Sequence, residues 1–200
     1  SKFYRIAKVL GLAIKLKEYK GSKVVEFSTL EKSRIEGHLL GDGSIFYTGK
    51  NKTLPVFGFV SKHESYLEWI CTTSSWATER PIWTRNQLDL RTNNIYTTYW
   101  FRTRAFDFFK QEHSRWYPNG KKIVPKDLSL TKESLLRWYL DDGCFHQEKI
   151  FFSTDGFEKE DTEYLNNLLE TLSFKSYLVK NGKGFRIYLN PKSTKDFLKY

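Results

Sequence analysis

The sequence has few cysteines and no long apolar segments. Cys71 and Cys144 are its only two cysteines, and neither belongs to a CxxC pair or a Cys/His cluster. This argues against a zinc site or a disulfide framework, and we expect a reducing compartment. No apolar run approaches the length of about 18 residues that would span a bilayer, so we expect no membrane association. The motifs GxGxxG and GxSxG are also absent, which argues against dinucleotide binding and serine hydrolysis.

The first twenty residues, SKFYRIAKVLGLAIKLKEYK, are basic and amphipathic. They lack the long apolar centre and the small-residue cleavage site of a removed targeting signal. We therefore interpret residues 1–30 as a basic N-terminal extension of the folded protein.

Positive charge is in excess. Thirty-three Lys and Arg oppose twenty-three Asp and Glu, which gives a net charge of +10. An excess of this size favours a polyanionic partner, most often nucleic acid, although a merely basic surface would give the same count. Phe, Tyr and Lys are abundant and have A/T-rich codons. We therefore expect an organelle, mitochondrion or chloroplast, rather than a prokaryotic cytoplasm.

The order of the predicted elements repeats once along the chain. Periodicity predicts helix, two strands, helix, two strands and helix in each half. The segments of the first half are 35–42, 44–48, 54–62, 63–76, 81–91, 95–102 and 104–111. Those of the second half are 135–142, 144–154 (strand-like throughout), 158–172, 175–180, 184–189 and 192–200.

Short sequence matches support a duplication. FVSK at 59–62 resembles FFST at 151–154, and DFFK at 107–110 resembles DFLK at 196–199. We place the first repeat at 31–116, a linker rich in Pro, Gly and Lys at 117–130, and the second repeat at 131–200. The predicted fold is α+β, with two antiparallel sheets backed by helices and related by a pseudo-twofold axis.

Both opening helices end in Asp-Gly, in IEGHLLGDG at 35–43 and LLRWYLDDG at 135–143. Gly37 and Gly41 share one helix face and would let the second helix approach closely. The pseudo-symmetry would bring Asp42 and Asp142 together, and adjacent carboxylates repel unless a cation or a proton lies between them. We expect Mg²⁺ or a similar hard cation there, serving phosphodiester cleavage. The alternative is that each Asp-Gly merely ends a helix.

The strand segment PIWTRNQLDLR at 81–91 alternates between two faces. One face carries Ile82, Leu88 and Leu90. The other carries donors and acceptors suited to base edges, although a solvated outer face is the alternative. Ser44 and Phe46, which follow the first Asp-Gly, are further candidates. The candidate DNA-reading residues are therefore Ser44, Phe46, Trp83, Arg85, Gln87, Asp89 and Arg91. The candidates for phosphate contacts at strand ends are Lys50, Lys52, Lys180, Lys183 and Arg186.

At the two Asp-Gly segments the sequence resembles the LAGLIDADG homing endonucleases, whose nine-residue motif matches 35–43 and 135–143. The resemblance covers roughly residues 30–200. It implies a monomer with a duplicated αββαββα fold that binds a long asymmetric DNA duplex across a saddle of strands and cuts both strands. It also implies that Asp42 and Asp142 bind the metal. The basic residue that the family places near the scissile phosphate would be Lys122, with Lys121 beside it, and the alternative is an ordinary linker lysine.

The second motif departs from the family pattern. Arg137 and Trp138 stand where small residues are usual, so close packing is less assured there. No lysine equivalent to Lys122 follows the second repeat, which implies a shortened chain or a degenerate second site. A rival interpretation is therefore an RNA-binding relative, either a splicing maturase or a ribonucleoprotein subunit, with intron RNA as partner. A basic DNA-binding repressor is a third interpretation, which the retained acids disfavour.

Overall fold

The computed structural model describes residues 26–49, 51–77 and 81–200. Most of the expected N-terminal extension lies outside these residues. The first half contains, in chain order, α2 (Thr29–Leu40), β1 (Ser44–Thr48), β2 (Leu54–Ser61), α3 (Glu64–Thr73), the short 3-10 helix η1 (Ser75–Ala77), β3 (Trp83–Asp89), β4 (Asn94–Arg102) and α4 (Asp107–Trp116). The second half contains α5 (Lys132–Asp142), β5 (Gly143–His146), β6 (Lys149–Ser153), α6 (Lys159–Thr171), β7 (Ser176–Asn181), β8 (Gly184–Leu189) and α7 (Pro191–Phe197).

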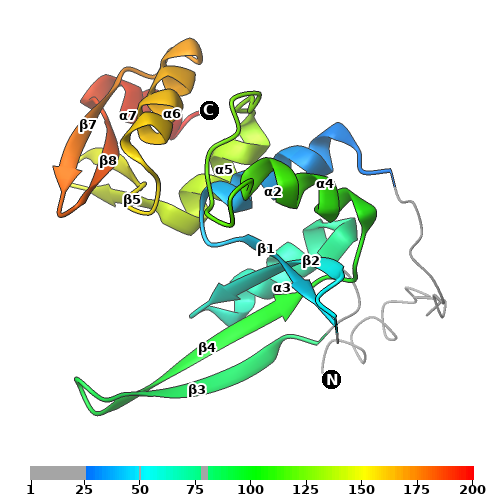
Figure 1. Ribbon diagram of the computed structural model, residues 1–200. Helices are drawn as coiled ribbons and strands as arrows, with labels where there is room; N and C mark the ends of the chain where they lie inside the picture. Colours follow the sequence, from blue (N-terminus) through cyan, green and yellow to red (C-terminus); the bar gives the residue numbers. More distant parts are fainter. Residues whose placement is uncertain (1–25, 50, 78–80) are drawn as a thin grey trace, which may run out of the picture.

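The two halves share one topology (Figure 1). Each forms a four-stranded antiparallel sheet, ordered β1-β2-β4-β3 in the first half and β5-β6-β8-β7 in the second. The predicted α+β fold with a duplicated αββαββα frame is therefore confirmed. The sequence predicted one strand-like segment at 144–154, where the structure has two strands, β5 and β6. They are joined by a tight turn in which Gln147 and Glu148 have φ of 48° and 60°.

One of the two sequence matches does not correspond to equivalent positions. DFFK begins α4, whereas DFLK begins at the sixth residue of α7. The match between FVSK and FFST is displaced by a single residue. The strand registers make Phe59 equivalent to Phe152, and both rings are buried.

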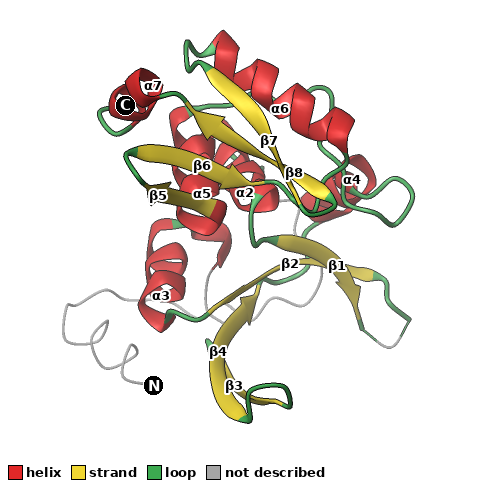
Figure 2. Cartoon of the chain, turned by 90° about the vertical axis from the view of Figure 1, so that its left-hand side faces the viewer, coloured by secondary structure: helices red, strands yellow, loops and turns green. Residues whose placement is uncertain are grey.

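The helices α2 and α5 pack side by side between the two sheets (Figure 2). Each begins with a capping box, made by Ser28 with Glu31 in α2 and by Thr131 with Ser134 in α5. These reciprocal bonds satisfy amide groups that a helix start would otherwise leave unpaired. The two helices therefore begin and end at defined residues, and this places their last turns together.

Close packing of the helix pair depends on glycine. A Cβ added to Gly37 would lie 2.4 Å from the Ser134 carbonyl oxygen and 2.7 Å from Arg137 Cβ. A Cβ added to Gly41 would lie 2.3 Å from Asp141 Cβ. The expected close approach is present, because Gly37 in α2 and Gly41 directly after it provide room for the larger residues of α5. Trp138 is fully buried and stacks on Phe152, with ring centroids 4.1 Å apart.

Each sheet has one face covered by helices and one open face. In the first sheet, α3 and α4 cover the side where Ile45, Phe57, Phe59 and Phe101 are buried. In the second sheet, α6 and α7 cover the side of Ile150, Phe152, Ile187 and Leu189. Directly paired residues of antiparallel strands point to the same face, and successive residues alternate. The registers therefore assign every strand residue to the covered or the open face.

The hairpin of β3 and β4 projects beyond the helices (Figure 1). On its helix side, Leu88 is 47% exposed and its partner Ile95 is 70% exposed. Leu90, after the strand, is 87% exposed. The apolar face expected from the alternation is therefore not covered at the hairpin tip. Among the described helices, none has the length and apolar character needed to cross a membrane.

Candidate active site and nucleic-acid interface

The last turns of α2 and α5 bring Asp42 and Asp142 into one charged cluster. Asp142 is the last residue of α5, and Asp42 follows α2 by two residues. Their charges interact, since the carboxylate of Asp42 raises the pKa of Asp142. The structure thus brings the two predicted acids together at the end of the central helix pair.

Both acids hold their protons more tightly than an exposed aspartate does. Loss of hydrating water, followed by the nearby charge of Asp141, raises the pKa of Asp42 to about 6. Burial, followed by the charges of Asp42 and Asp141, raises the pKa of Asp142 to about 7. Such raised values are expected where carboxylates crowd together in a partly desolvated place. They mark a site that a cation would stabilise.

Lys122 lies in the same cluster. Its Nζ donates to the carbonyl oxygens of Gly41, at 3.1 Å, and Gly43, at 2.9 Å, on either side of Asp42. Burial lowers its pKa to about 8, although the neighbouring acids, Asp142 first, act in the opposite direction. Lys122 therefore lies beside the two acids, where its position is compatible with the role that the resemblance implies.

The neighbouring Lys121 is placed differently. Its Nζ pairs with the Glu158 carboxylate at the start of α6, and both side chains are largely exposed. The segment expected as a linker, 117–130, also contributes to the hydrophobic core, because Val124 and Leu128 are buried there. This packing holds the segment against both halves and thereby holds Lys122 at the acids.

The donor set suits a hard cation that needs further ligands. Asp42 and Asp142 supply carboxylate oxygens, which Mg²⁺ prefers, and Mg²⁺ keeps waters or substrate oxygens in its other positions. Among the residues described, no group of three or more His, Cys, Asp and Glu side chains could enclose a metal by itself. The cluster therefore fits a cation that takes its remaining ligands from outside the described residues.

A third acid at this place was not singled out from the sequence. Asp141 precedes Asp142, and its side chain is fully buried. Its Oδ2 lies 2.9 Å from His38 Nδ1, and its Oδ1 accepts from the Tyr66 hydroxyl at 2.5 Å. The sequence signal was the first acid in Asp-Asp-Gly, Asp141, which stands where the first motif has Gly41. Local pattern alone gave no reason to expect the contact with α3.

The candidate DNA-reading residues of the first half share one face. Ser44 pairs with Gly58, and Trp83 pairs with Trp100, both on the open side of the sheet. The strand residues that the registers place there are Ser44, Phe46, Trp83, Arg85, Gln87 and Asp89. Arg91 lies in the turn after β3, and its side chain is 87% exposed. The alternation read from the sequence therefore gave a face that helices leave open.

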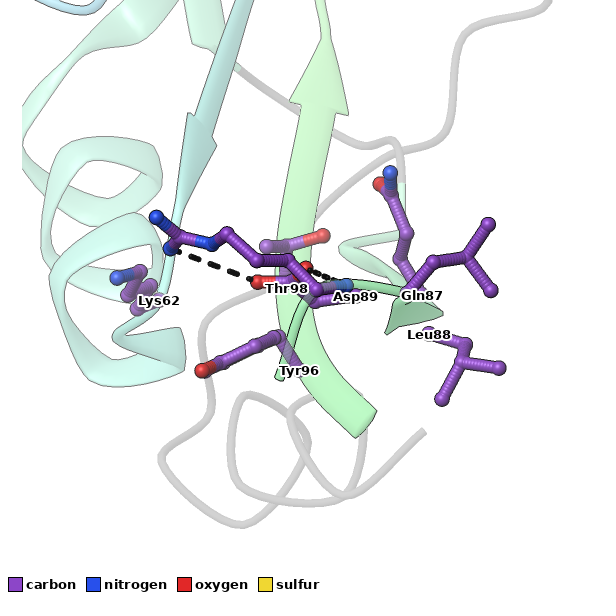
Figure 3. Close-up of a pocket in the computed structure, with 8 residues that line it drawn as sticks. Lys62, Gln87, Leu88, Asp89, Tyr96 and Thr98 are labelled. Carbon is purple, nitrogen blue, oxygen red and sulfur yellow. Dashed lines mark hydrogen bonds and ion pairs between the residues drawn. The ribbon is translucent and has the colours of Figure 1, made fainter. Parts of the chain in front are cut away.

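A groove of about 650 Å³ lies on this hairpin (Figure 3). Its lining residues are Lys62, Gln87, Leu88, Asp89, Leu90, Arg91, Tyr96 and Thr98. Asp89 accepts from the Arg91 backbone amide at 2.9 Å, and the Lys62 Nζ lies 6.0 Å from the Tyr96 ring centroid. The groove thus presents both hydrogen-bonding groups and an aromatic ring.

The candidate phosphate-contacting residues lie at different kinds of position in the structure. Arg186 is on the open face, where its Nε donates to Asp155 Oδ2 at 2.9 Å. Lys180 pairs with Phe185 on the side that the helices cover, and Lys183 lies in the turn that follows β7. In the first half, Lys52 is exposed in the β1–β2 turn with φ of 50°. Lys50 lies outside the described residues.

Further open-face residues of the second sheet were missed. The registers place His146, Lys149, Tyr177, Asn181 and Tyr188 there. The alternation in SYLVKN and GFRIYL was the available signal, because Ile187 and Leu189 are buried and Tyr188 between them is not. The two sheets therefore present different side chains on their open faces.

Comparison with known proteins agrees with this architecture. The sequence model of the LAGLIDADG DNA endonuclease family matches residues 32–197. The homing endonuclease I-WcaI, in a structure bound to its DNA recognition sequence, has a similar fold with a TM-score of 0.80. The similarity covers 92% of this chain and 89% of that chain at 23% identity.

Two relatives are similar in sequence over different lengths. The cytochrome b mRNA maturase bI2 of Debaryomyces hansenii is 30% identical over 178 residues, which are 82% of this chain and 66% of that protein. The uncharacterized protein MJ1098 of Methanocaldococcus jannaschii is 35% identical over 82 residues, 39% of this chain and 32% of that protein. The chain thus spans less than two thirds of the length of these relatives. Because the family match covers most of the sequence, the chain belongs to the LAGLIDADG DNA endonuclease family.

Proposed function

We propose that the chain is a site-specific, divalent-cation-dependent DNA endonuclease that acts as a monomer and cuts both strands of a duplex. The observation that carries the proposal is the meeting of Asp42, Asp142 and Lys122 at the end of the helix pair. Carboxylates repel phosphate, so two of them beside a basic, open pair of sheets are favourable only if a cation joins them to the substrate. In a repressor, which binds DNA without cutting it, these two acids would only weaken binding to the phosphates.

The two open faces support an asymmetric target. The first hairpin offers Arg85, Gln87 and Asp89, whose side chains can donate to or accept from base edges. The second sheet offers Asn181 at the place that corresponds to Arg85, and Tyr177, Tyr188 and Lys149 elsewhere on its open face. Because the halves differ, each would read a different sequence, and their combined length favours a long site.

The chemistry divides among few groups. A bound Mg²⁺ or similar cation would supply polarisation of the phosphate, activation of water and stabilisation of the leaving oxygen. Asp42 and Asp142 would hold that cation. The ammonium group of Lys122 has three N–H donors, and two are used by the carbonyls of Gly41 and Gly43. The third can orient a water or screen charge on the phosphate, and a pKa of about 8 lets Lys122 exchange a proton near neutral pH.

The test is cleavage of a duplex library that contains the DNA flanking the gene, in Mg²⁺ and in Ca²⁺. We expect Asp42→Asn with Asp142→Asn to abolish cutting and to leave binding largely intact. The matched control is Asp107→Asn with Asp196→Asn, which makes the same change in charge on α4 and α7. Unchanged double-strand cleavage by the first pair would refute the assignment.

A second candidate function is RNA splicing as a maturase, with intron RNA as partner. It is favoured by the similarity to the cytochrome b mRNA maturases bI2 of Debaryomyces hansenii and Saccharomyces cerevisiae. Tight, specific binding of the host intron RNA without cleavage of any flanking duplex would establish this function instead. Under either function we propose an organellar gene, and an intron or intein position for that gene would support it.

A further inference from the structure

A buried polar bridge joins the first half of the chain to the second beside the acids. Asp141 of α5 contacts His38 of α2 through one carboxylate oxygen and Tyr66 of α3 through the other. The side chains of His38 and Asp141 are completely buried. Both oxygens of one carboxylate are therefore held by the opposite half.

The bridge has no counterpart in the other direction. The position equivalent to Asp141 is Gly41, where an added Cβ would lie 2.3 Å from Asp141 Cβ. The position equivalent to His38 is Trp138, whose ring stacks on Phe152. Hence Asp141 of the second half bonds to polar side chains of the first half, whereas Gly41 of the first half makes no such bond to the second. The pseudo-symmetry is broken at this pair of positions.

The surroundings make the bridge rigid. The His38 ring lies edge-on to Phe59 and Trp76, with centroids 5.1 and 6.2 Å away. The Tyr66 ring packs against Phe59 and is stacked on Trp69, 5.7 Å away. Hydrogen bonds that are shielded from water are strong, and leaving their partners unpaired is unfavourable. Asp141 therefore has one favourable orientation, which its neighbours determine.

We propose that Asp141, His38 and Tyr66 are positioning residues that direct Asp142 toward its cation. One peptide unit separates Asp141 from Asp142, so the orientation of the first limits that of the second. Asp42 has no such anchor and depends on the Lys122 contacts with the carbonyls of Gly41 and Gly43. The effect on cation binding rests on the proposed function. The orientation of Asp142 by Asp141, His38 and Tyr66 is a property of the free protein.

The experiment compares Tyr66→Phe with Glu133→Gln. Tyr66→Phe removes one hydroxyl and keeps the ring packing. Glu133→Gln weakens another contact of the same helix pair, the 2.8 Å bond with Arg34 Nε at its opposite end. We expect Tyr66→Phe to shift the backbone amide resonances of Asp142 and Gly143 in the DNA-free protein, and Glu133→Gln to leave them in place.

In complex with duplex DNA, Tyr66→Phe should weaken Mn²⁺ binding about tenfold, as measured by electron paramagnetic resonance. Its effect on cleavage should differ between the two strands, because only one acid loses its anchor. Asp141→Asn should act in the same sense if it folds. Unchanged amide shifts and Mn²⁺ affinity in Tyr66→Phe, or equal changes in Glu133→Gln, would overturn the proposal. If the wild-type chain cuts no duplex, the proposed function fails, and the amide shifts still decide the positioning role.

Discussion

Replacing Asp142 by Asn should stabilise the free protein while it removes activity. In the unfolded chain an aspartate ionises near its ordinary pKa of 3.8, but burial and the charges of Asp42 and Asp141 raise the pKa of Asp142 to about 7 in the folded state. The folded state therefore gains stability from the protonated form below pH 3.8, and that gain is lost as the pH rises through 7. Asparagine has nearly the same shape and no charge, so it avoids this loss.

The size of the effect follows from the two pKa values. Taken alone, the difference corresponds to about 4 kcal/mol above pH 7. The carboxyl group is only partly buried, and water screens its repulsion. We therefore expect Asp142→Asn to raise the free energy of unfolding by about 1–3 kcal/mol at pH 8. For a chain of this length that is a rise in Tm of about 2–12 °C.

Thermal unfolding followed by circular dichroism at pH 4 and pH 8 measures the effect. The difference between variant and wild type should be near zero at pH 4 and positive at pH 8. Asp127→Asn is the control with the opposite sign, because its exposed carboxylate pairs with Arg115 Nε at 2.8 Å. A variant less stable than wild type at pH 8, or an equal difference at both pH values, would refute the reasoning.

Other predictions concern recognition and catalysis. Arg85→Ala should relax specificity at one or two base pairs, by about 1–3 kcal/mol if the contact is bidentate, and a binding screen over all single substitutions measures this. Lys183→Ala should weaken binding to every sequence and flatten its salt dependence, which titrations at several salt concentrations would show. Lys122→Ala should slow cutting of one strand more than the other, so that supercoiled plasmid accumulates as nicked circle; equal slowing of both strands would contradict this. In Mg²⁺, cleavage should rise between pH 6 and pH 8, because Asp42 and Asp142 must lose their protons before they bind a cation, and a pH–rate profile tests it.

Local patterns in the sequence predicted most of the elements and the place of the two acids at the ends of the central helices. The 3.6-residue period and the Asp-Gly ends predicted the two helices at whose ends Asp42 and Asp142 lie. Two-residue alternation correctly assigned Arg85 and Gln87 to a common face, because side chains of a strand must point alternately to its two sides. These features depend on neighbours a few residues away, so the sequence displays them directly.

Where two residues or segments look alike in sequence, only the tertiary structure decided the position of each in the fold. Lys121 and Lys122 are indistinguishable by local pattern, yet packing of the segment around Val124 directs only Lys122 to the acids. Similarly, DFFK and DFLK agree at three of their four letters but begin at different turns of their helices.

The bridge at Asp141 depends most on the tertiary structure. Its partners His38 and Tyr66 are 103 and 75 residues away in the chain, on two helices of the other half. The sequence by itself determined that the chain has two related halves, each ending a helix on an acid. Gly37 and Gly41 predicted that the two helices approach closely, but only the packing of α5 against α2 and α3 decided that the side chain of Asp141 is the buried one. Such packing is a property of residues distant in sequence, and no local pattern encodes it.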